Sequence, residues 1–567
     1  MRTIRIFAAI AVAALTVSSC DDFLKTIPGD KVSPELTWKT EEDANRFVTG
    51  CYSDWADRYA YFYWDCCSDI GYAQFPWEGF TVIGNGSMSP ADYGYSFYDY
   101  STIARCNTYL ANESRITFSS ESVRKDLQAQ VRAIRAYRYF MMTYLYSADC
   151  AGTGEWGRWS TVPLITAPLA NSDDAKQPRA DMSTMRDFIM SELDTCLLHI
   201  NDTPSERGRI AKPAVYMMKM RVLQYFMSSS DQCGYTWQDL AEFIGNNLLT
   251  GRDVSENAHN VFTLEKQNDP EIILPLMSTS SNSDYSCWEV ATMFPNSLGG
   301  WSSMVPTLAL VDMFPMANGY PITDPASGYD PQNPFANRDS RLTAFILCNG
   351  STLYGRVLDY VHKKLPGGED GDVDNPDYPV GDNSSKTGFN WRKYVFTENG
   401  YPDMWNTDCC PILFRYTEAF LSYAEALNEV VGPTGTIPGS YQRSAYQVIK
   451  KIREVAGIYG DSYLESIKND KEKMRELIRN ERAITMCGEG LRRFDLLRWH
   501  EYGPFSRPVQ TLSIKDPDTL GAPFEYDWDN LKIAEEREFH EYNKVLPIPQ
   551  SAVDNNPKLV QNPGYAQ

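Results

Sequence analysis

The sequence predicts a mainly α-helical protein: a tetratricopeptide-like superhelix of stacked helix pairs that carries an irregular capping region with a few short strands. Two observations lead to this prediction. Apolar residues recur every three or four positions in residues 20–233 and 395–567, which is the period of a helix with one buried face. Residues 234–394 lack that period and are rich in Pro, Gly, Asn and Ser. Helix pairs that bury their faces on one another form solenoids, although this chain has no clear repeat of about 34 residues.

Four helices are predicted in the N-terminal part. The clearest lies at Ser122–Ser147, where Val123, Leu127 and Val131 begin an apolar stripe that continues to Leu145. The others show the same spacing over shorter lengths. The four predicted helices are Glu41–Arg58, Ser122–Ser147, Thr184–His199 and Lys212–Met227.

The middle part, residues 234–394, is predicted to consist of loops and short strands. Its most acidic stretch, Gly367–Asn383, is a loop by its turn residues. Asp370, Asp372 and Asp374 alternate there as the first three ligands of an EF-hand calcium loop do, but the positions that require Gly and Glu hold other residues. We therefore interpret the stretch as a solvated acidic loop. Calcium is the weaker alternative, and no other cofactor is expected.

Periodic apolar residues return in the C-terminal part, and the last predicted helix also pairs charges. Glu489 lies four residues before Arg493, and Asp495 lies three residues before Arg498. Leucine and phenylalanine fill the positions between them, which is not typical of a solvated helix. We therefore predict a continuous helix whose ion pairs are partly buried and serve folding rather than ligand contact. The three helices predicted in this part are Pro411–Val431, Tyr441–Ala456 and Lys471–Trp499.

Composition and motifs argue against several functions. The formal net charge of −21 does not suit nucleic acid, whose phosphates require a basic surface. Five histidines without an HExxH motif argue against a zinc site. The chain has 74 acidic residues, so carboxylate pairs are common, and none stands out as the pair that a glycosidase needs. We therefore expect no catalytic residue and no metal site.

The first twenty residues have the pattern of a lipoprotein export signal. Two arginines precede the apolar run Ile6–Val17, which is too short to span a bilayer because a spanning helix takes about 20 residues. Small serines then precede Cys20, as in a lipobox. We predict that residues 1–19 are removed and that Cys20 is acylated; an uncleaved short anchor is the alternative. The chain has 13 cysteines without a CxxC pattern, and their pairing is not predicted, although export would permit disulfides.

Two segments that contain Gly and Pro carry aromatic residues outside any helical stripe. A ring on a loop can stack on the C–H face of a sugar while Asn or Asp holds the hydroxyls. Local loop packing is the alternative for each residue. Trp77, Trp288 and Trp301 are the best candidates for a shared sugar platform because they are large and flat. The candidate ligand-binding residues are Asp69, Tyr72, Phe75 and Trp77 in Cys67–Ser87, and Tyr285, Trp288, Asn296 and Trp301 in Ser283–Met304.

Several stretches resemble the signatures of one family. Asn480–Trp499 (NERAITMCGEGLRRFDLLRW) resembles the ER-x-x-EL-x-x-EG-x-R-x-x-DL-x-RW motif of the SusD/RagB outer-membrane nutrient-binding lipoproteins, and it departs from that motif at Thr485–Met486. Ile412–Glu429 (ILFRYTEAFLSYAEALNE) is similar to the family's IRYAE-x-x-L-x-YAEA-x-NE element. The tail Val545–Tyr565 (VLPIPQSAVDNNPKLVQNPGY) is similar to the family's closing PIP and QNPGY elements.

The resemblance implies a fold and a function. Residues 20–567 would form one SusD-like fold in which the charged signature is scaffold. The protein would be lipid-anchored to the outer membrane, facing the cell exterior, where it would bind an oligosaccharide and deliver it to a SusC-like TonB-dependent transporter. Asp21 and Asp22 resemble a surface-export signal, and family members commonly place their glycan platform on loops in the two aromatic segments. The alternatives are the same lid role for a peptide or another nutrient, or a surface glycosidase.

Overall fold

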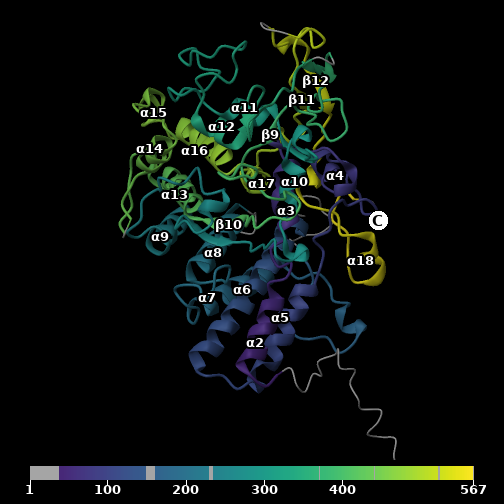
Figure 1. Cartoon of the computed structure of the whole chain (residues 1–567). Coiled ribbons are helices and arrows are strands. Elements are labelled where there is room, and N and C mark those ends of the chain that lie inside the picture. The colour runs from purple at the N-terminus through teal and green to yellow at the C-terminus, as the bar shows by residue number, and fades with distance from the viewer. Residues whose placement is uncertain are drawn as a thin grey trace, which may run out of the picture.

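Successive helices of the chain pack against one another (Figure 1). The computed structural model describes residues 38–148, 160–228, 234–368, 371–439, 441–520 and 524–565. Within them α6 packs on α7, α7 on α8, α8 on α9, α9 on α13, and α13 on both α14 and α16. This confirms a mainly helical, tetratricopeptide-like fold. The stacked helices are α2 (Glu41–Cys51), α5 (Ser101–Asn112), α6 (Glu121–Tyr146), α7 (Met182–Leu197), α8 (Lys212–Ser228), α9 (Trp237–Asn247), α13 (Tyr416–Val431), α14 (Ala445–Val455) and α16 (Lys471–Thr485).

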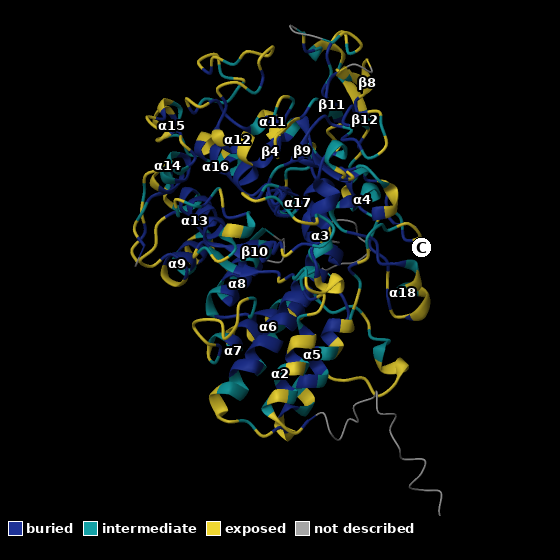
Figure 2. Cartoon of the chain, viewed as in Figure 1, coloured by how far each residue is buried: buried dark blue, intermediate teal, exposed yellow. Residues whose placement is uncertain are grey.

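Buried residues follow the contact faces of the stacked helices, and exposed residues lie on their outer faces and on the loops (Figure 2). The predicted helices Ser122–Ser147, Thr184–His199 and Lys212–Met227 are confirmed as α6, α7 and α8. The helix α9 falls within residues 234–394, where no helix was predicted. It begins with a capping box in which Thr236 and Asp239 bond each other's backbone N–H groups. None of the described helices is both long and apolar enough to cross a membrane.

The predicted helix Glu41–Arg58 is wrong in its length. α2 ends at Cys51, and Asp54 adopts a positive φ of 56°, which a right-handed helix does not accommodate. A new helix, α3 (Arg58–Tyr63), starts after Asp57, whose side chain caps the N–H of Ala60 at 3.0 Å.

The predicted helix Pro411–Val431 begins instead as a strand. β10 (Ile412–Arg415) pairs antiparallel with β2 (Ile272–Pro275), and only Tyr416–Val431 is helical, as α13. All four residues of β10 are buried. A short run that is apolar on both faces fits a buried strand as well as a helix, so its period alone could not separate the two.

The predicted helix Lys471–Trp499 is interrupted. α16 ends at Thr485, and α17 (Arg492–Arg498) begins only after a turn. Gly488 and Gly490 have positive φ angles of 73° and 71°, which end a right-handed helix. Gly490 also permits a close approach, since a Cβ there would lie 2.5 Å from the carbonyl oxygen of Tyr61. The prediction of one continuous helix is therefore wrong.

A buried carboxylate holds this turn. Asp65, in the 3₁₀ helix η2 (Trp64–Cys67), accepts hydrogen bonds from the N–H groups of Gly488 at 2.7 Å, Gly490 at 3.2 Å and Arg492 at 3.0 Å. Burial raises the pKa of Asp65 to about 6 although these donors oppose the shift. The turn between α16 and α17 is therefore fixed to a segment more than half the chain away.

The capping part is built of paired short strands rather than one sheet. The described residues form six two-stranded antiparallel sheets: β1–β3, β2–β10, β4–β9, β5–β6, β7–β8 and β11–β12. The remaining strands are β1 (Gly71–Ala73), β3 (Met304–Pro306), β4 (Ile346–Leu347), β5 (Thr352–Leu353), β6 (Arg356–Val357), β7 (Lys364–Leu365), β8 (Val373–Asp374), β9 (Asn390–Trp391), β11 (Val509–Thr511) and β12 (Lys532–Glu535). The short helices are α4 (Thr81–Asn85), α10 (Glu289–Met293), α11 (Leu308–Met313), α12 (Ser340–Phe345), α15 (Ser462–Ile467) and α18 (Gln550–Asn555).

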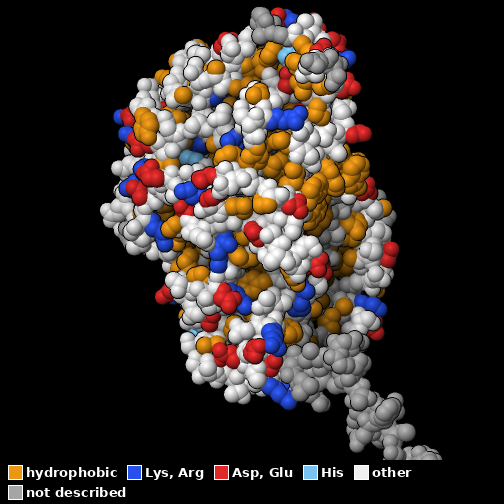
Figure 3. All heavy atoms as spheres, in the orientation of Figure 1, with side chains coloured by type: hydrophobic (Ala, Val, Ile, Leu, Met, Phe, Trp, Pro, Cys, Tyr) orange, Lys and Arg blue, Asp and Glu red, His pale blue; other side chains and the backbone are white. Residues whose placement is uncertain are grey.

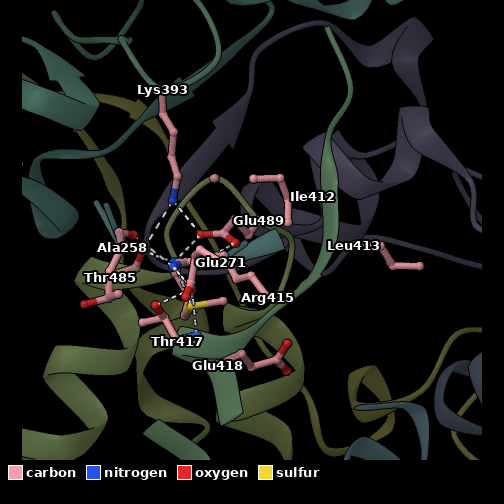
Figure 4. Close-up of polar contacts among 12 residues, drawn as sticks. Ala258, Glu271, Lys393, Ile412, Leu413, Arg415, Thr417, Glu418, Thr485 and Glu489 are labelled. Carbon is pink, nitrogen blue, oxygen red and sulfur yellow. Dashed lines mark hydrogen bonds and ion pairs between the residues drawn. The ribbon is translucent and has the colours of Figure 1, made fainter. Parts of the chain in front are cut away.

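Glu489 is the centre of a buried charge cluster (Figure 4). Its carboxylate lies 2.7 Å from Arg415 Nε and 2.6 Å from Lys393 Nζ, and Arg415 Nη1 also lies 3.5 Å from Glu271. All four side chains are at most 2% exposed. Burial alone would raise the pKa of Glu489, but the two cations hold that pKa below its ordinary value.

Of the two ion pairs predicted from spacing, one is confirmed. Asp495 lies 2.9 Å from Arg498, which also binds Glu425 of α13 at 2.7 Å. The pairing of Glu489 with Arg493 is wrong because the glycine turn directs Glu489 towards Arg415. Arg493 donates instead to two backbone carbonyl oxygens.

A second cluster joins α12, α14 and α16. Arg341 lies 2.6 Å from Asp339 and 2.8 Å from Glu481, and it donates to Thr485 Oγ1 at 2.9 Å. Glu481 also binds Arg453 of α14 at 2.5 Å. Thr485, one of the two residues that depart from the charged signature, thus still accepts a hydrogen bond from an arginine.

Removing Arg415 should destabilise the fold strongly. Arg415→Ala leaves Glu489 buried with one cation instead of two, and breaking a buried pair costs about 3–5 kcal/mol. The matched control is Arg443→Ala, because Arg443 and Asp253 form an ion pair at 2.7 Å with side chains 39% and 44% exposed; an exposed pair contributes about 0–1 kcal/mol. Urea denaturation of both variants measures the two free energies of unfolding. Equal losses would contradict a structural role for the Glu489 cluster.

Candidate functional site

Strand pairing brings the two aromatic segments together. β1 and β3 are antiparallel with Tyr72 opposite Val305, and the N–H of Gln74 continues the ladder by donating to the carbonyl of Ser303 at 3.0 Å. Cys67–Ser87 and Ser283–Met304 therefore lie side by side, although they are far apart in the sequence. Apolar side chains gather over α3, α10 and α4 on the face seen in Figure 3.

Trp77 is the most exposed of the three candidate tryptophans. It lies in the 3₁₀ helix η3 (Pro76–Glu78), with 77% of its surface open to solvent. The ring of Phe75 stacks against it, with centroids 4.7 Å apart and planes 10° apart. Phe75 therefore supports one face of the Trp77 ring, which a single mobile side chain would lack.

Trp288 lies directly before α10 and is 37% exposed. Its ring stacks on that of Tyr59 from α3 at 5.6 Å, and Tyr59 in turn lies 5.6 Å from Tyr95. The N–H of Tyr95 donates to the carbonyl of Gly79 at 2.7 Å, two residues beyond Trp77. A chain of contacts through two tyrosines thus connects Trp288 to the turn that carries Trp77.

Trp301 is 42% exposed and is backed by Trp405, whose ring centroid is 4.5 Å away. The next residue, Ser302, has a φ of 46°, a strained value for a residue with a Cβ. The side-chain amide of Asn390 donates to Ser302 Oγ at 3.1 Å and to the carbonyl of Met293 at 3.0 Å. These bonds hold the strained turn and with it the position of Trp301.

The other candidates differ in exposure. Tyr285 is exposed, whereas the half-buried Asn296 uses its amide to donate to the carbonyls of Pro376 and Asp382, which ties down the loop Gly367–Asn383. Asp69 is buried in an ion pair with Arg492 at 2.9 Å, and Tyr72 is buried in the β1–β3 ladder. Asp69 and Tyr72 therefore lie beneath the surface, where they support it.

We call Phe75, Trp77, Trp288, Trp301 and Trp405, with Tyr59 behind them, the aromatic surface. Trp405 and Tyr59 were missed from the sequence. Trp405 lies in GYPDMWNTD, which has the same mixture of Gly, Pro and aromatic residues as the two predicted segments, so this signal was present. Tyr59 directly follows the predicted helix Glu41–Arg58, and no sequence signal distinguishes it.

Metal ligation has no support in the described part of the chain, where no group of three or more His, Cys, Asp or Glu side chains is arranged to hold an ion. Of the acidic loop, Asp372 and Asp374 are described, and Asp374 pairs with Lys364 in the β7–β8 ladder. Asp370 lies outside the described residues.

Two buried carboxyl groups lie next to tryptophans of the aromatic surface. Glu289 follows Trp288 and forms an ion pair with Arg58 at 3.1 Å. Glu78 follows Trp77 and is buried, and burial raises the pKa of its carboxyl to about 7. The hydroxyls of Tyr63 and Ser303 are close enough to oppose that shift in part, but neither forms a well-aligned hydrogen bond with Oε2. Tyr63 belongs to the helix of Tyr59, and Ser303 follows Trp301 by two residues, so Glu78 touches the supports of all three tryptophans.

Comparison with known proteins gives consistent matches. Residues 270–565 match the model of the SusD family. The SusD-like protein P25 of Formosa agariphila is 24% identical over 96% of this chain and 97% of its own. Among solved structures, a SusD-like carbohydrate-binding protein from Bacteroides fragilis has a TM-score of 0.71 at 20% identity, covering 92% of this chain and 100% of that chain. Surface glycan-binding protein A from Bacteroides thetaiotaomicron has a TM-score of 0.62 at 16% identity, covering 92% and 99%.

The raised pKa of Glu78 should make folding stability depend on pH. Below pH 4.5 the proton is bound in the folded and unfolded states alike; as pH rises towards about 7, the unfolded state releases it first, so stability falls. Glu78→Gln should remove this part of the loss, on the order of 3 kcal/mol at most. Urea denaturation at pH 5 and pH 8 measures it, with Glu42→Gln at an exposed position as control. Equal pH slopes in parent and Glu78→Gln would contradict the assignment.

Proposed function

Because the chain belongs to the SusD family, we propose that it is a non-enzymatic surface lipoprotein that captures an oligosaccharide and delivers it to a SusC-like TonB-dependent transporter. The observation that carries the proposal is the aromatic surface, in which three exposed tryptophans lie on two segments that strand pairing brings side by side. The proposed location is the outer membrane, facing the cell exterior.

The arrangement of rings suits a sugar. The apolar C–H face of a pyranose stacks on a flat aromatic ring, and each tryptophan of the surface is backed by a second ring: Phe75, Tyr59 or Trp405. Backed rings lose little rotamer freedom when a ligand binds, so more of the contact energy appears as affinity. Several separated rings would contact successive residues of an oligosaccharide rather than a single monosaccharide.

Two alternatives to non-enzymatic oligosaccharide binding are a different ligand and an enzymatic function. A peptide or another nutrient could use the same lid arrangement, with its apolar groups on the rings. A surface glycosidase would need a second carboxylate about 5–10 Å from the first in the cleft. The described carboxyl groups beside Trp77 and Trp288 are Glu78 and Glu289; both are buried, and Glu289 is held in an ion pair with Arg58 at 3.1 Å. Non-enzymatic binding is therefore the proposal that these observations favour.

Losing any one of the three tryptophans should weaken oligosaccharide binding. A ring-stacking contact is worth about 1–3 kcal/mol, so Trp77→Ala, Trp288→Ala and Trp301→Ala should each lower affinity roughly ten- to hundredfold. Tyr459→Ala is the matched control, because Tyr459 is 75% exposed on the connection between α14 and α15, away from the aromatic surface. Calorimetry with a panel of oligosaccharides, on variants that melt as the parent does, measures the effect.

The same titrations separate the alternatives. Binding should be unaffected by chelators, and the ligand should be recovered intact. Parent-like affinity in all three variants would place the ligand elsewhere. A panel of peptides that binds where oligosaccharides do not would favour the nutrient alternative, and a shortened oligosaccharide would show that the protein is an enzyme.

The lipid anchor is tested at Cys20, which lies outside the described residues. We expect Cys20→Ala to abolish acylation and to release the chain from the membrane fraction, while oligosaccharide affinity stays at the parent value because the aromatic surface is unchanged. Fractionation and intact-mass spectrometry of the parent and the variant check this. A variant that remains membrane-bound would show that the anchor is not at Cys20.

A further inference from the structure

Two cysteine side chains meet beneath the aromatic surface. Cys287 immediately precedes Trp288, and Cys409 closes the loop that carries Trp405. Burial and the neighbouring Cys409 both raise the pKa of the Cys287 thiol, and both side chains are buried. Both are free thiols in this structure. The contact joins segments that are far apart in the chain and that each carry a ring of the surface.

Three hydrogen bonds through Thr407 hold the backbones of the two cysteines near each other. The N–H of Cys287 donates to the carbonyl of Thr407 at 3.0 Å, and Thr407 Oγ1 donates to the carbonyl of Cys287 at 2.7 Å. The N–H of Cys409 donates to the same Thr407 hydroxyl at 3.3 Å. A disulfide requires that the two backbones already approach closely, and these three bonds provide that approach.

We propose that Cys287 and Cys409 form a disulfide in the exported protein, which fixes the turn of Trp288 to the segment of Trp405. The inference rests on the proposed surface location, because disulfides form and persist outside the reducing cytosol. It deepens the proposed function by adding a covalent support under the ligand-binding rings.

The chemistry is a thiol–disulfide exchange with an oxidised thiol oxidoreductase of the export compartment. Two thiols of this chain lose two protons and two electrons and become one S–S bond, while the oxidoreductase disulfide takes them up and becomes two thiols. The attacking group is a thiolate. Burial raises the pKa of the Cys287 thiol far above its ordinary value, so we expect the exchange to take place during folding, while the thiol is still exposed to solvent.

The neighbouring cysteine provides a built-in comparison. Cys410 directs its sulfur elsewhere, 3.6 Å from Arg207 Nη1 and 3.9 Å from the carbonyl of Ser278. Burial and the neighbouring Cys51 likewise raise the pKa of the Cys106 thiol, where α2 packs on α5. We restrict the inference to Cys287 and Cys409 because the Thr407 bonds bring these two backbones together as well.

Peptide mapping tests the bond directly. The full chain is extracted in detergent from cells that export it, unfolded without reductant in the presence of iodoacetamide, and digested. We expect one linked peptide that contains Cys287 and Cys409, lighter by two hydrogen atoms than the sum of its parts, and a carbamidomethyl group on Cys410. Carbamidomethyl groups on both Cys287 and Cys409, or a bond from Cys287 to Cys410, would overturn the inference.

Stability gives a second readout that does not depend on mapping. Dithiothreitol should lower the melting temperature of the parent by several degrees, because the bond closes a long loop in the unfolded chain. It should have no further effect on Cys287→Ser or Cys409→Ser, whose melting temperatures are already lowered, while Cys410→Ser should respond as the parent does. If the reductant lowers the melting temperature of Cys287→Ser as much as that of the parent, the bond is not there.

An in-vitro arm separates this inference from the proposed function. The full chain is refolded in detergent with oxidised glutathione and mapped in the same way. If the chain is not exported but the linked peptide forms in this refolding experiment, the proposed surface location is wrong, whereas the ability of Cys287 and Cys409 to form a disulfide is supported. If Cys287 and Cys409 stay unlinked in this experiment, the disulfide proposal is wrong. The measurement of oligosaccharide binding then still tests the proposed function independently.

Discussion

A carboxylate sealed from water must be surrounded by cations and hydrogen-bond donors, and in this protein that requirement falls on Glu489. Its partners come from distant parts of the chain: Arg415 from the junction of β10 and α13, and Lys393 from the segment after β9. Isolated burial of any one of these charges would cost several kcal/mol. The helical stack and the irregular capping part are therefore joined by a set of charges that are stable only together.

The aromatic surface depends on the same centre. The turn that presents Glu489 also presents three N–H groups to Asp65, and Asp65 belongs to η2, which leads through Asp69 into β1. Asp69 is fixed in turn by Arg492 at the start of α17. From β1 the chain runs directly into η3 and Trp77. The exposed rings are thus supported by buried ion pairs and short two-stranded sheets rather than by one broad sheet.

The elements that could be predicted from the sequence are those whose signal is local. The stripe of α6 repeats over seven turns, so its position and length followed from spacing alone. The break at Gly488 and Gly490 did not follow, because the residues around it keep a helical pattern and the φ angles are imposed by Asp65 and by the close approach of Tyr61. At the site, the loop composition indicated that Trp77, Trp288 and Trp301 lie outside the helices. It could not show that the Asp69 carboxylate is already paired with Arg492. Pairing across the chain, as between Trp301 and Trp405, has no local signature.

Under the proposed function, the ring behind each exposed tryptophan has a consequence for the rate at which a ligand binds. A surface whose rings are already ordered needs no loop closure before a ligand can dock, so association should proceed at similar rates for many sugars. Differences between ligands then appear in how long each complex lasts. A protein of this kind would sample passing chains quickly and select among them by residence time.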